Sequence, residues 1–153
     1  PEGSILKTYR EDVSMDEMRL KKFGLDIAAS TVKIQRFLDH EIAHGKKIYG
    51  YGASSRGNTI LQYMGLTSKH LTAIADRNPE KWGKFTVGTN IPIWNEEEVR
   101  SLKPDYLFVL PYHLIDSFIS REHVFLDNGG KFILPIPEPR IIEGANGKVV
   151  NYL

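Results

Sequence analysis

The segment 50–58, which reads GYGASSRGN, carries the residue types best suited to binding chemistry. It resembles the phosphate-binding turn G-x-G-x-x-G, with Ser55 at the position of the third glycine. Small residues let the backbone approach a phosphate, and the helix that follows such a turn points free N–H groups at the anion. The alternative is that these glycines only make a tight turn between a strand and a helix. The residues that we expect to meet a phosphate are Gly52, Ser54, Ser55, Arg56, Gly57 and Asn58.

Polar side chains also follow two other apolar runs. Asp76 ends one of them, with Asn78 two residues later, and an acid at the end of the second strand of a nucleotide-binding unit can reach a ribose diol. Tyr112 and His113 follow the other run, where a lone histidine can act as a general base. Each residue also has a local alternative: Asp76 caps a loop, and His113 packs and caps at the start of a helix.

The segment 40–44 reads HEIAH and matches H-E-x-x-H, in which two histidines one turn apart hold zinc and the glutamate activates water. Neither complete form of the motif is present. Lys47 stands where the extended form has glycine, and the form that needs a downstream glutamate has none between Glu41 and Glu80. Gly45 ends the helix at once, and histidines are favourable near the negative end of a helix dipole. We therefore expect a solvated helix end and no metal site.

The composition, 41% hydrophobic and 25% charged residues over 153 positions, is that of one globular domain. Twenty Lys and Arg against nineteen Asp and Glu leave a net charge of +1, so we expect no nucleic-acid partner and no membrane-surface role. The absence of cysteine excludes disulfides, thiol nucleophiles and cysteine-ligated metals. With no leader pattern and no apolar run that spans a bilayer, we expect a cytoplasmic protein. Because the chain starts at Pro1, we expect a piece of a longer protein.

The spacing of apolar residues predicts the helices and strands that must position these residues. Apolar residues at helical spacing, among them Phe23 and Ile34, predict one helix over about 16–44, or two with a break near 29–31. Residues 4–9 fit a short strand. Asn95 is expected to cap a helix with three acids, at 96–98, in its first turn. The expected strands are 47–51, 71–75, 91–93, 106–110 and 132–136, with helices at 57–64 and 114–126 and an edge strand at 148–152.

Strands that alternate with helices predict an α/β fold with a doubly wound, mainly parallel, Rossmann-like sheet after a long N-terminal helix. Ligands of such sheets bind outside the carboxyl ends of the strands, where the strand order reverses. With the order 3-2-1-4-5, the segments 52–58 and 111–113 face each other across one crevice. We expect residues 1–15 to be the remnant of a preceding domain or linker, and residues 16–153 to form one domain.

Six stretches, in order over about 45–137, resemble the C-terminal domain of S-adenosylmethionine-dependent C-methyltransferases that act on nucleoside-diphosphate hexoses. They read YGASSRGNT (51–59), ADRNPEK (75–81), GTNIPI (88–93), PDY (104–106), LPYH (110–113) and GGKFI (129–133). Several motifs in one order are more specific than one glycine-rich turn. The chain departs from the family pattern at Val87, where proline is commoner, and at Tyr112-His113, where Trp-Asn is frequent.

The resemblance implies a domain that helps to hold the sugar nucleotide against a central domain. It also implies an N-terminal zinc-binding region and a central methyl-donor domain, both outside this chain. S-adenosylmethionine would serve the full-length enzyme without binding to this chain, and no catalytic residue would lie here. We therefore expect the isolated chain to bind a nucleoside-diphosphate sugar and to be inactive alone.

Two other functions stay open on the residues alone. One is a stand-alone nucleotide-binding or interaction module without catalysis. The other is a domain of an NAD-dependent oxidoreductase, which Ser55 at the third glycine position disfavours.

Overall fold

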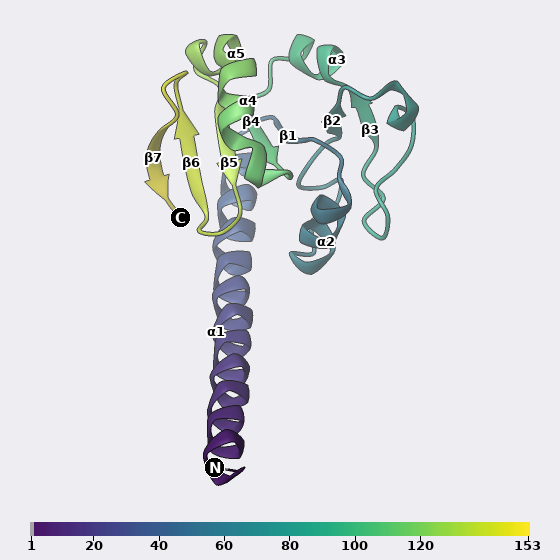
Figure 1. Cartoon of the computed structure of the whole chain (residues 1–153). Helices are drawn as coiled ribbons and strands as arrows, with labels where there is room; N and C mark the ends of the chain where they lie inside the picture. The colour runs from purple at the N-terminus through teal and green to yellow at the C-terminus, as the bar shows by residue number, and fades with distance from the viewer. Residues whose placement is uncertain (1) are drawn as a thin grey trace.

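A seven-stranded sheet forms the centre of the domain in the computed structural model (Figure 1). The structure describes residues 2–153, with the side chains of 13–22, 24–151 and 153. The strand order is β3-β2-β1-β4-β5-β6-β7. The strands are β1 (Ile48–Tyr51), β2 (Ile74–Asp76), β3 (Ile93–Asn95), β4 (Tyr106–Val109), β5 (Lys131–Leu134), β6 (Arg140–Glu143) and β7 (Lys148–Tyr152).

The sheet is mixed rather than purely parallel, and it contains one strand, β6, that the sequence analysis did not predict. Strands β3, β2, β1, β4 and β5 run parallel, while β6 and β7 are antiparallel. The full strand order therefore differs from the predicted 3-2-1-4-5, because two strands are added beyond β5. The edge strand expected at 148–152 is β7. Strand β6 was not predicted, because its four residues are too few to show an alternation of apolar and polar side chains. A turn with positive φ at Gly144 and Gly147 follows it.

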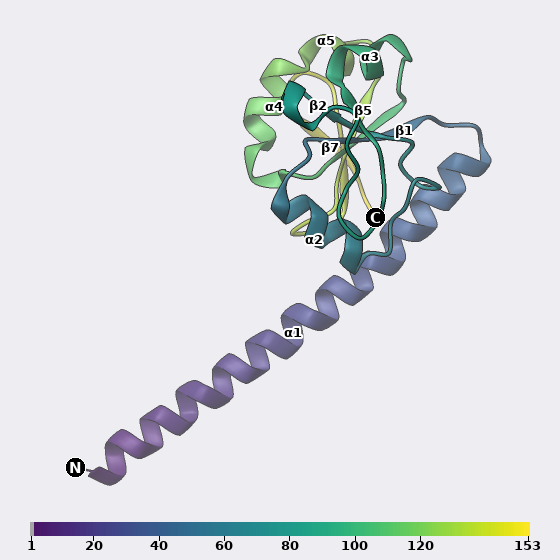
Figure 2. The same ribbon diagram turned by 90° about the vertical axis from the view of Figure 1, so that its right-hand side faces the viewer.

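Helix α1 (Glu2–Ala43) runs without interruption, so neither the break near 29–31 nor the strand expected at 4–9 is correct. It passes through residue 15, and the domain boundary expected there stays a prediction. Pro1 and the side chain of Phe23 lie outside the described residues. Most of α1 projects away from the sheet (Figure 1, Figure 2). None of the described helices has an apolar stretch long enough to cross a membrane.

The remaining helices are short. Asn95 caps α3 as expected, since its side chain accepts a hydrogen bond from the N–H of Glu97. The helix expected at 114–126 is interrupted, because Glu122 leaves helical geometry at φ −99° and ψ 23° and turns its side chain into the protein. The elements are α2 (Ser55–Tyr63), η1 (Pro79–Lys81), α3 (Glu96–Ser101), η2 (Tyr112–Leu114), α4 (Ile115–Arg121) and α5 (His123–Asp127).

Helices cover both faces of the sheet, and alternate residues of each strand supply the two cores. On one face, Ile34 and Leu38 of α1 and Leu61 of α2 pack against the strands. On the other face, α3, α4 and α5 contribute Val99, Phe118 and Leu126. The parallel strands are therefore covered on both faces, as their continuous apolar runs predict. Ligands of such a sheet bind at the carboxyl ends of its strands.

Candidate functional site

The carboxyl ends of β1 and β4 lie side by side and bring together the two loops predicted to face each other. Tyr51 pairs with Val109 at this end of the sheet. Gly52 follows with φ +81°, and a Cβ there would lie 2.6 Å from Cγ of Pro111. A Cβ on Gly57 would lie 2.8 Å from Cβ of Leu110. Both glycines are thus required for packing between the two loops, whatever they also do for a ligand.

The start of α2 satisfies some of its own N–H groups and leaves others open. Ser54 is the N-cap, and its Oγ accepts a hydrogen bond from the N–H of Gly57 over 3.0 Å. The N–H of Asn58 donates to the carbonyl of Ser54 over 2.9 Å. The N–H groups of Ser55 and Arg56, in the first turn, have no acceptor within the helix. These two N–H groups, rather than those at 57–58, are therefore available to an anion.

The side chains of Ser55 and Arg56 are exposed, and that of Asn58 is half-buried. No hydrogen bond or ion pair joins the Arg56 guanidinium to any described residue. The five N–H donors of this guanidinium group therefore have no partner among the described residues, and they lie beside the helix start.

Asp76 ends β2 as predicted, but its carboxylate points into the protein and is 7% exposed. One oxygen accepts the N–H of Ala53 and the other accepts the N–H of Asn78, each over 2.8 Å. The indole N–H of Trp82 donates to the Asp76 carbonyl over 2.7 Å. Asp76 therefore ties the loop after β1 to the loop after β2. Contact of Asp76 with a ribose stays a prediction.

Lys81 is a residue of this site that the sequence analysis missed. Its Nζ donates to the carbonyl of Ala53 over 2.5 Å and lies 3.5 Å from the Asp76 carboxylate. The only sequence signal was its place in the ADRNPEK stretch, five residues after the strand. Lys81 lines a cavity of about 190 Å³ whose other lining residues are Ala53, Ser54, Ser55, Asn58, Phe85, Thr86 and Ile93. This cavity is thus rich in hydrogen-bond donors and holds one positive charge.

The other predicted site residues lie near the ends of neighbouring strands. Asn78 caps η1, accepting the N–H of Glu80 with its side-chain oxygen over 3.0 Å. Tyr112 is half-buried and His113 is exposed, both in η2 directly after β4. Their ring centroids are 6.0 Å apart in an edge-to-face arrangement. None of these three lines the cavity that contains Lys81.

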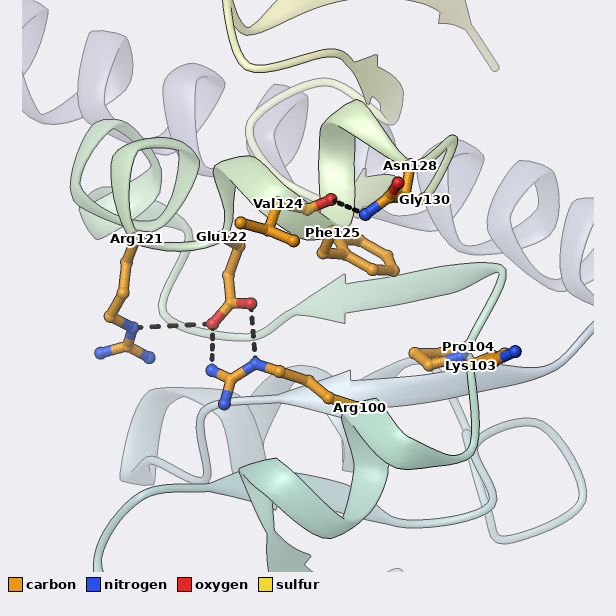
Figure 3. Close-up of a pocket in the computed structure, with 9 residues that line it drawn as sticks. All are labelled: Arg100, Lys103, Pro104, Arg121, Glu122, Val124, Phe125, Asn128 and Gly130. Atoms are coloured by element: carbon orange, nitrogen blue, oxygen red, sulfur yellow. Dashed lines mark hydrogen bonds and ion pairs between the residues drawn. The ribbon is translucent and has the colours of Figure 1, made fainter.

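A second polar cluster, also missed, lies on the α3–α5 face of the sheet. The Glu122 side chain, 3% exposed, accepts the hydroxyl of Tyr51 over 2.7 Å and two N–H groups of Arg100. Arg121 donates to the Tyr51 hydroxyl and to Glu96. Figure 3 shows the side chains of Arg100 and Arg121 directed at the Glu122 carboxylate. We call these five residues the Glu122 cluster. A cavity of about 700 Å³ adjoins it, lined also by Val124 and Phe125.

Burial and hydrogen bonding act in opposite directions on the Glu122 carboxyl. Burial raises the pKa of Glu122, but hydrogen bonds and charges from Arg100, Tyr51 and Arg121 outweigh it, so the net pKa lies below its ordinary value. Burial, followed by the hydrogen bond to Glu122, raises the pKa of the Tyr51 hydroxyl. Both guanidinium groups already have carboxylate partners. The Glu122 cluster is thus internally neutralised.

The H-E-x-x-H segment lies at the end of α1 without the geometry of a metal centre. Glu41 accepts the hydroxyl of Tyr106 over 2.7 Å, and the imidazole of His44 lies 2.7 Å from the carbonyl of His40. Over the part of the chain that the structure describes, no three His, Asp or Glu side chains gather closely enough to hold a metal. Glu41 therefore anchors the end of α1 to β4.

Two comparisons with known proteins bear on this architecture. The family described as "C-methyltransferase C-terminal domain" matches residues 5–137. The chain is 35% identical over 126 residues, or 82% of its length, to "C-methyltransferase NovU" of Streptomyces niveus. The matched region spans only 30% of that relative. The family match extends over most of the sequence, including the loops after β1 and β4, and the chain therefore belongs to the C-methyltransferase C-terminal domain family.

Proposed function

We propose that this domain binds the sugar-nucleotide substrate of a C-methyltransferase at the carboxyl ends of the strands, in the crevice beside the start of α2. The observation that carries this proposal is the cavity lined by Ser54, Ser55, Asn58 and Lys81 at the carboxyl ends of the strands. Membership of a methyltransferase family supports it as well. A ligand that is anionic and rich in hydroxyls matches donors of this kind.

In this proposal the diphosphate lies at the start of α2. The free N–H groups of Ser55 and Arg56 face it at the positive end of the helix dipole. The guanidinium of Arg56 and the ammonium of Lys81 supply positive charge, and the hydroxyls of Ser54 and Ser55 donate to phosphate oxygens. Gly52 and Gly57 contribute by holding the two loops in close contact. The sequence predicts this backbone contact at 57–58, whereas in this proposal it lies at Ser55 and Arg56, two residues nearer the helix start.

The hexose then extends toward the loop after β4. Tyr112 and His113 follow that strand directly and are accessible, so they would face the sugar across the crevice. Asn78 lies beyond β2 and would meet the nucleoside end, although its side-chain oxygen is engaged with Glu80 N–H. Its amide group keeps donors for a ligand.

We place the methyl donor of the whole enzyme outside this chain. The family match is to a C-terminal domain, and the matched region spans only 30% of the curated relative, so the proposal leaves methyl-donor binding to the preceding polypeptide. NAD is disfavoured because Ser55 takes the position of the third glycine of the dinucleotide-binding turn. The whole enzyme would use S-adenosylmethionine to methylate a carbon beside a keto group after enolate formation. This chain would supply substrate binding, and the preceding zinc-binding and donor domains of the polypeptide would supply the rest.

A thermal-shift panel tests this proposal directly. The ligands are the diphosphates of thymidine, guanosine and cytidine, their hexose derivatives, NAD and S-adenosylmethionine. A ligand at about 100 times its Kd stabilises a protein by about 2.7 kcal/mol, which gives a clear rise in Tm. We expect stabilisation by at least one sugar nucleotide and none by S-adenosylmethionine. Stabilisation by S-adenosylmethionine, or by no sugar nucleotide, would contradict the proposal.

A further inference from the structure

Helix α1 carries an apolar face that continues beyond the domain it packs on. Ile34 and Leu38 are 0% exposed and belong to the core. Ile27, Leu20 and Val13 precede Ile34 at intervals of seven residues, which keeps them on nearly the same side of the helix. Leu20 is 70% exposed and Val13 is 41% exposed. The face that is buried at one end of α1 is therefore uncovered along the rest.

A second apolar stripe runs along another side of the same segment. Met18, Leu25 and Val32 are also seven residues apart and are 68%, 71% and 46% exposed. At 3.6 residues per turn, Leu25 lies about 140° around the helix from Leu20. A helix that is apolar on two sides is typical of one surrounded by protein.

Little within α1 itself stabilises this projecting segment in water. The ion pair between Asp16 and Arg19 has a separation of 3.8 Å and side chains that are 73% and 74% exposed, and such pairs contribute little. Gly24 lies in the middle of the segment and weakens the helix. Helices owe most of their stability to tertiary packing of an apolar face. A partner for this segment is therefore expected.

The identity of the partner follows from the two stripes and from the family. We propose that residues 13–32 of α1 are buried against the polypeptide that precedes this domain in the full-length protein. The family is a C-terminal domain, and the matched region spans only 30% of the curated relative. The amino end of α1 lies far from the sheet (Figure 2), so preceding polypeptide joins the chain beside the uncovered stripes. A second copy of α1 would cover one narrow seam only.

This packing would give α1 a positioning role. At 1.5 Å per residue its 42 residues span about 63 Å. With its carboxyl end fixed in the core by Ile34 and Leu38, a rigid α1 would set where the preceding polypeptide stands relative to the crevice. This consequence rests on the proposed function, whereas the burial of the two stripes does not.

Hydrogen–deuterium exchange tests the burial. The amides of residues 13–32 are compared in the 153-residue chain and in the full-length protein, and we expect exchange about a hundredfold slower in the latter. Leu20→Lys/Leu25→Lys in the full-length protein should abolish that protection, while the matched variant Lys21→Gln/Lys22→Gln should keep it. Equal exchange in the two proteins would overturn the proposal.

Sedimentation of the 153-residue chain distinguishes the two possible partners of α1, which are the preceding polypeptide and a second copy of the chain. A monomer at all concentrations agrees with the proposal, and a dimer that Leu20→Lys/Leu25→Lys dissociates would overturn it in favour of a second copy. The same variant should leave sugar-nucleotide affinity unchanged. If the parent chain binds no sugar nucleotide, the proposed function fails while the exchange result still decides the burial of α1.

Discussion

The Glu122 cluster and the crevice at the start of α2 are both polar, but only the crevice has groups to spare. The Glu122 cluster adjoins the larger cavity, about 700 Å³ against about 190 Å³. Its two guanidinium groups already bind Glu96 and Glu122. At the crevice, Arg56 has no partner among the described residues, and two N–H groups of α2 lack acceptors. Available hydrogen-bond donors, rather than cavity volume or the number of charged residues, therefore distinguish the proposed binding site from the Glu122 cluster.

The largest effect is expected from breaking the Glu122 cluster. Glu122→Ala leaves Arg100, Arg121 and the Tyr51 hydroxyl without their shared acceptor, and removing one partner of a buried ion pair costs about 3–5 kcal/mol. The free energy of unfolding, measured in urea, should fall by that amount. The exposed Glu138→Ala serves as control and should stay within about 0.5 kcal/mol. A folded Glu122→Ala protein that has lost affinity for sugar nucleotides would refute the separation of the two regions.

The next effect concerns the loop contact that shapes the crevice. Gly52→Ala and Gly83→Ala both place a side chain at positive φ, but only the first meets a neighbour, Pro111. Overpacking costs about 1–3 kcal/mol, so Gly52→Ala should lower the free energy of unfolding by that much more than Gly83→Ala. Equal losses of unfolding free energy in the two variants would show that Pro111 moves aside without a measurable cost.

Acid should weaken the Glu122 cluster and the contact of Glu41 with β4. The folded-state pKa of Glu122 lies below its unfolded value, as does that of Glu41. Both groups therefore stabilise the fold above pH about 4.5, and this stability is lost as the pH falls through their folded pKa values. Urea unfolding between pH about 7 and 3 should show a decline only at the acid end. Glu122→Gln should flatten that decline, and an unchanged slope would assign it to other carboxyls.

The smallest effect is expected at the histidine pair. His40 and His44 are exposed, with ring centroids 4.3 Å apart, and they form no group of three that could hold a metal with any other described side chain. His40→Ala/His44→Ala should change the free energy of unfolding by less than about 0.5 kcal/mol and leave metal content unchanged. Stoichiometric zinc that the double variant loses would restore the H-E-x-x-H motif as a metal site.

Local patterns predicted the elements near the crevice well, because each depends on neighbours in sequence. The cap at Asn95 and the turn after β1 are examples. The Glu122 cluster could not be predicted, since Tyr51 and Glu122 are 71 residues apart and the interruption at Glu122 follows from their contact. Asp76 shows the same limit: its place after β2 was predicted, but the inward direction of its carboxylate depends on Ala53 of another loop.

Calorimetric titration of Arg56→Ala tests the central claim most directly. The titrant is whichever thymidine, guanosine or cytidine diphosphate sugar binds the parent chain. Arg36→Ala is the control because it removes an exposed arginine of α1 that does not line the cavity at the start of α2. A charge-assisted contact to phosphate is about twice as strong as a neutral one, so Arg56→Ala should weaken binding about tenfold at low salt. The loss should shrink at about 1 M salt, where the Debye length is about 3 Å. Equal affinities of Arg56→Ala and Arg36→Ala at every salt concentration would contradict a diphosphate at the start of α2.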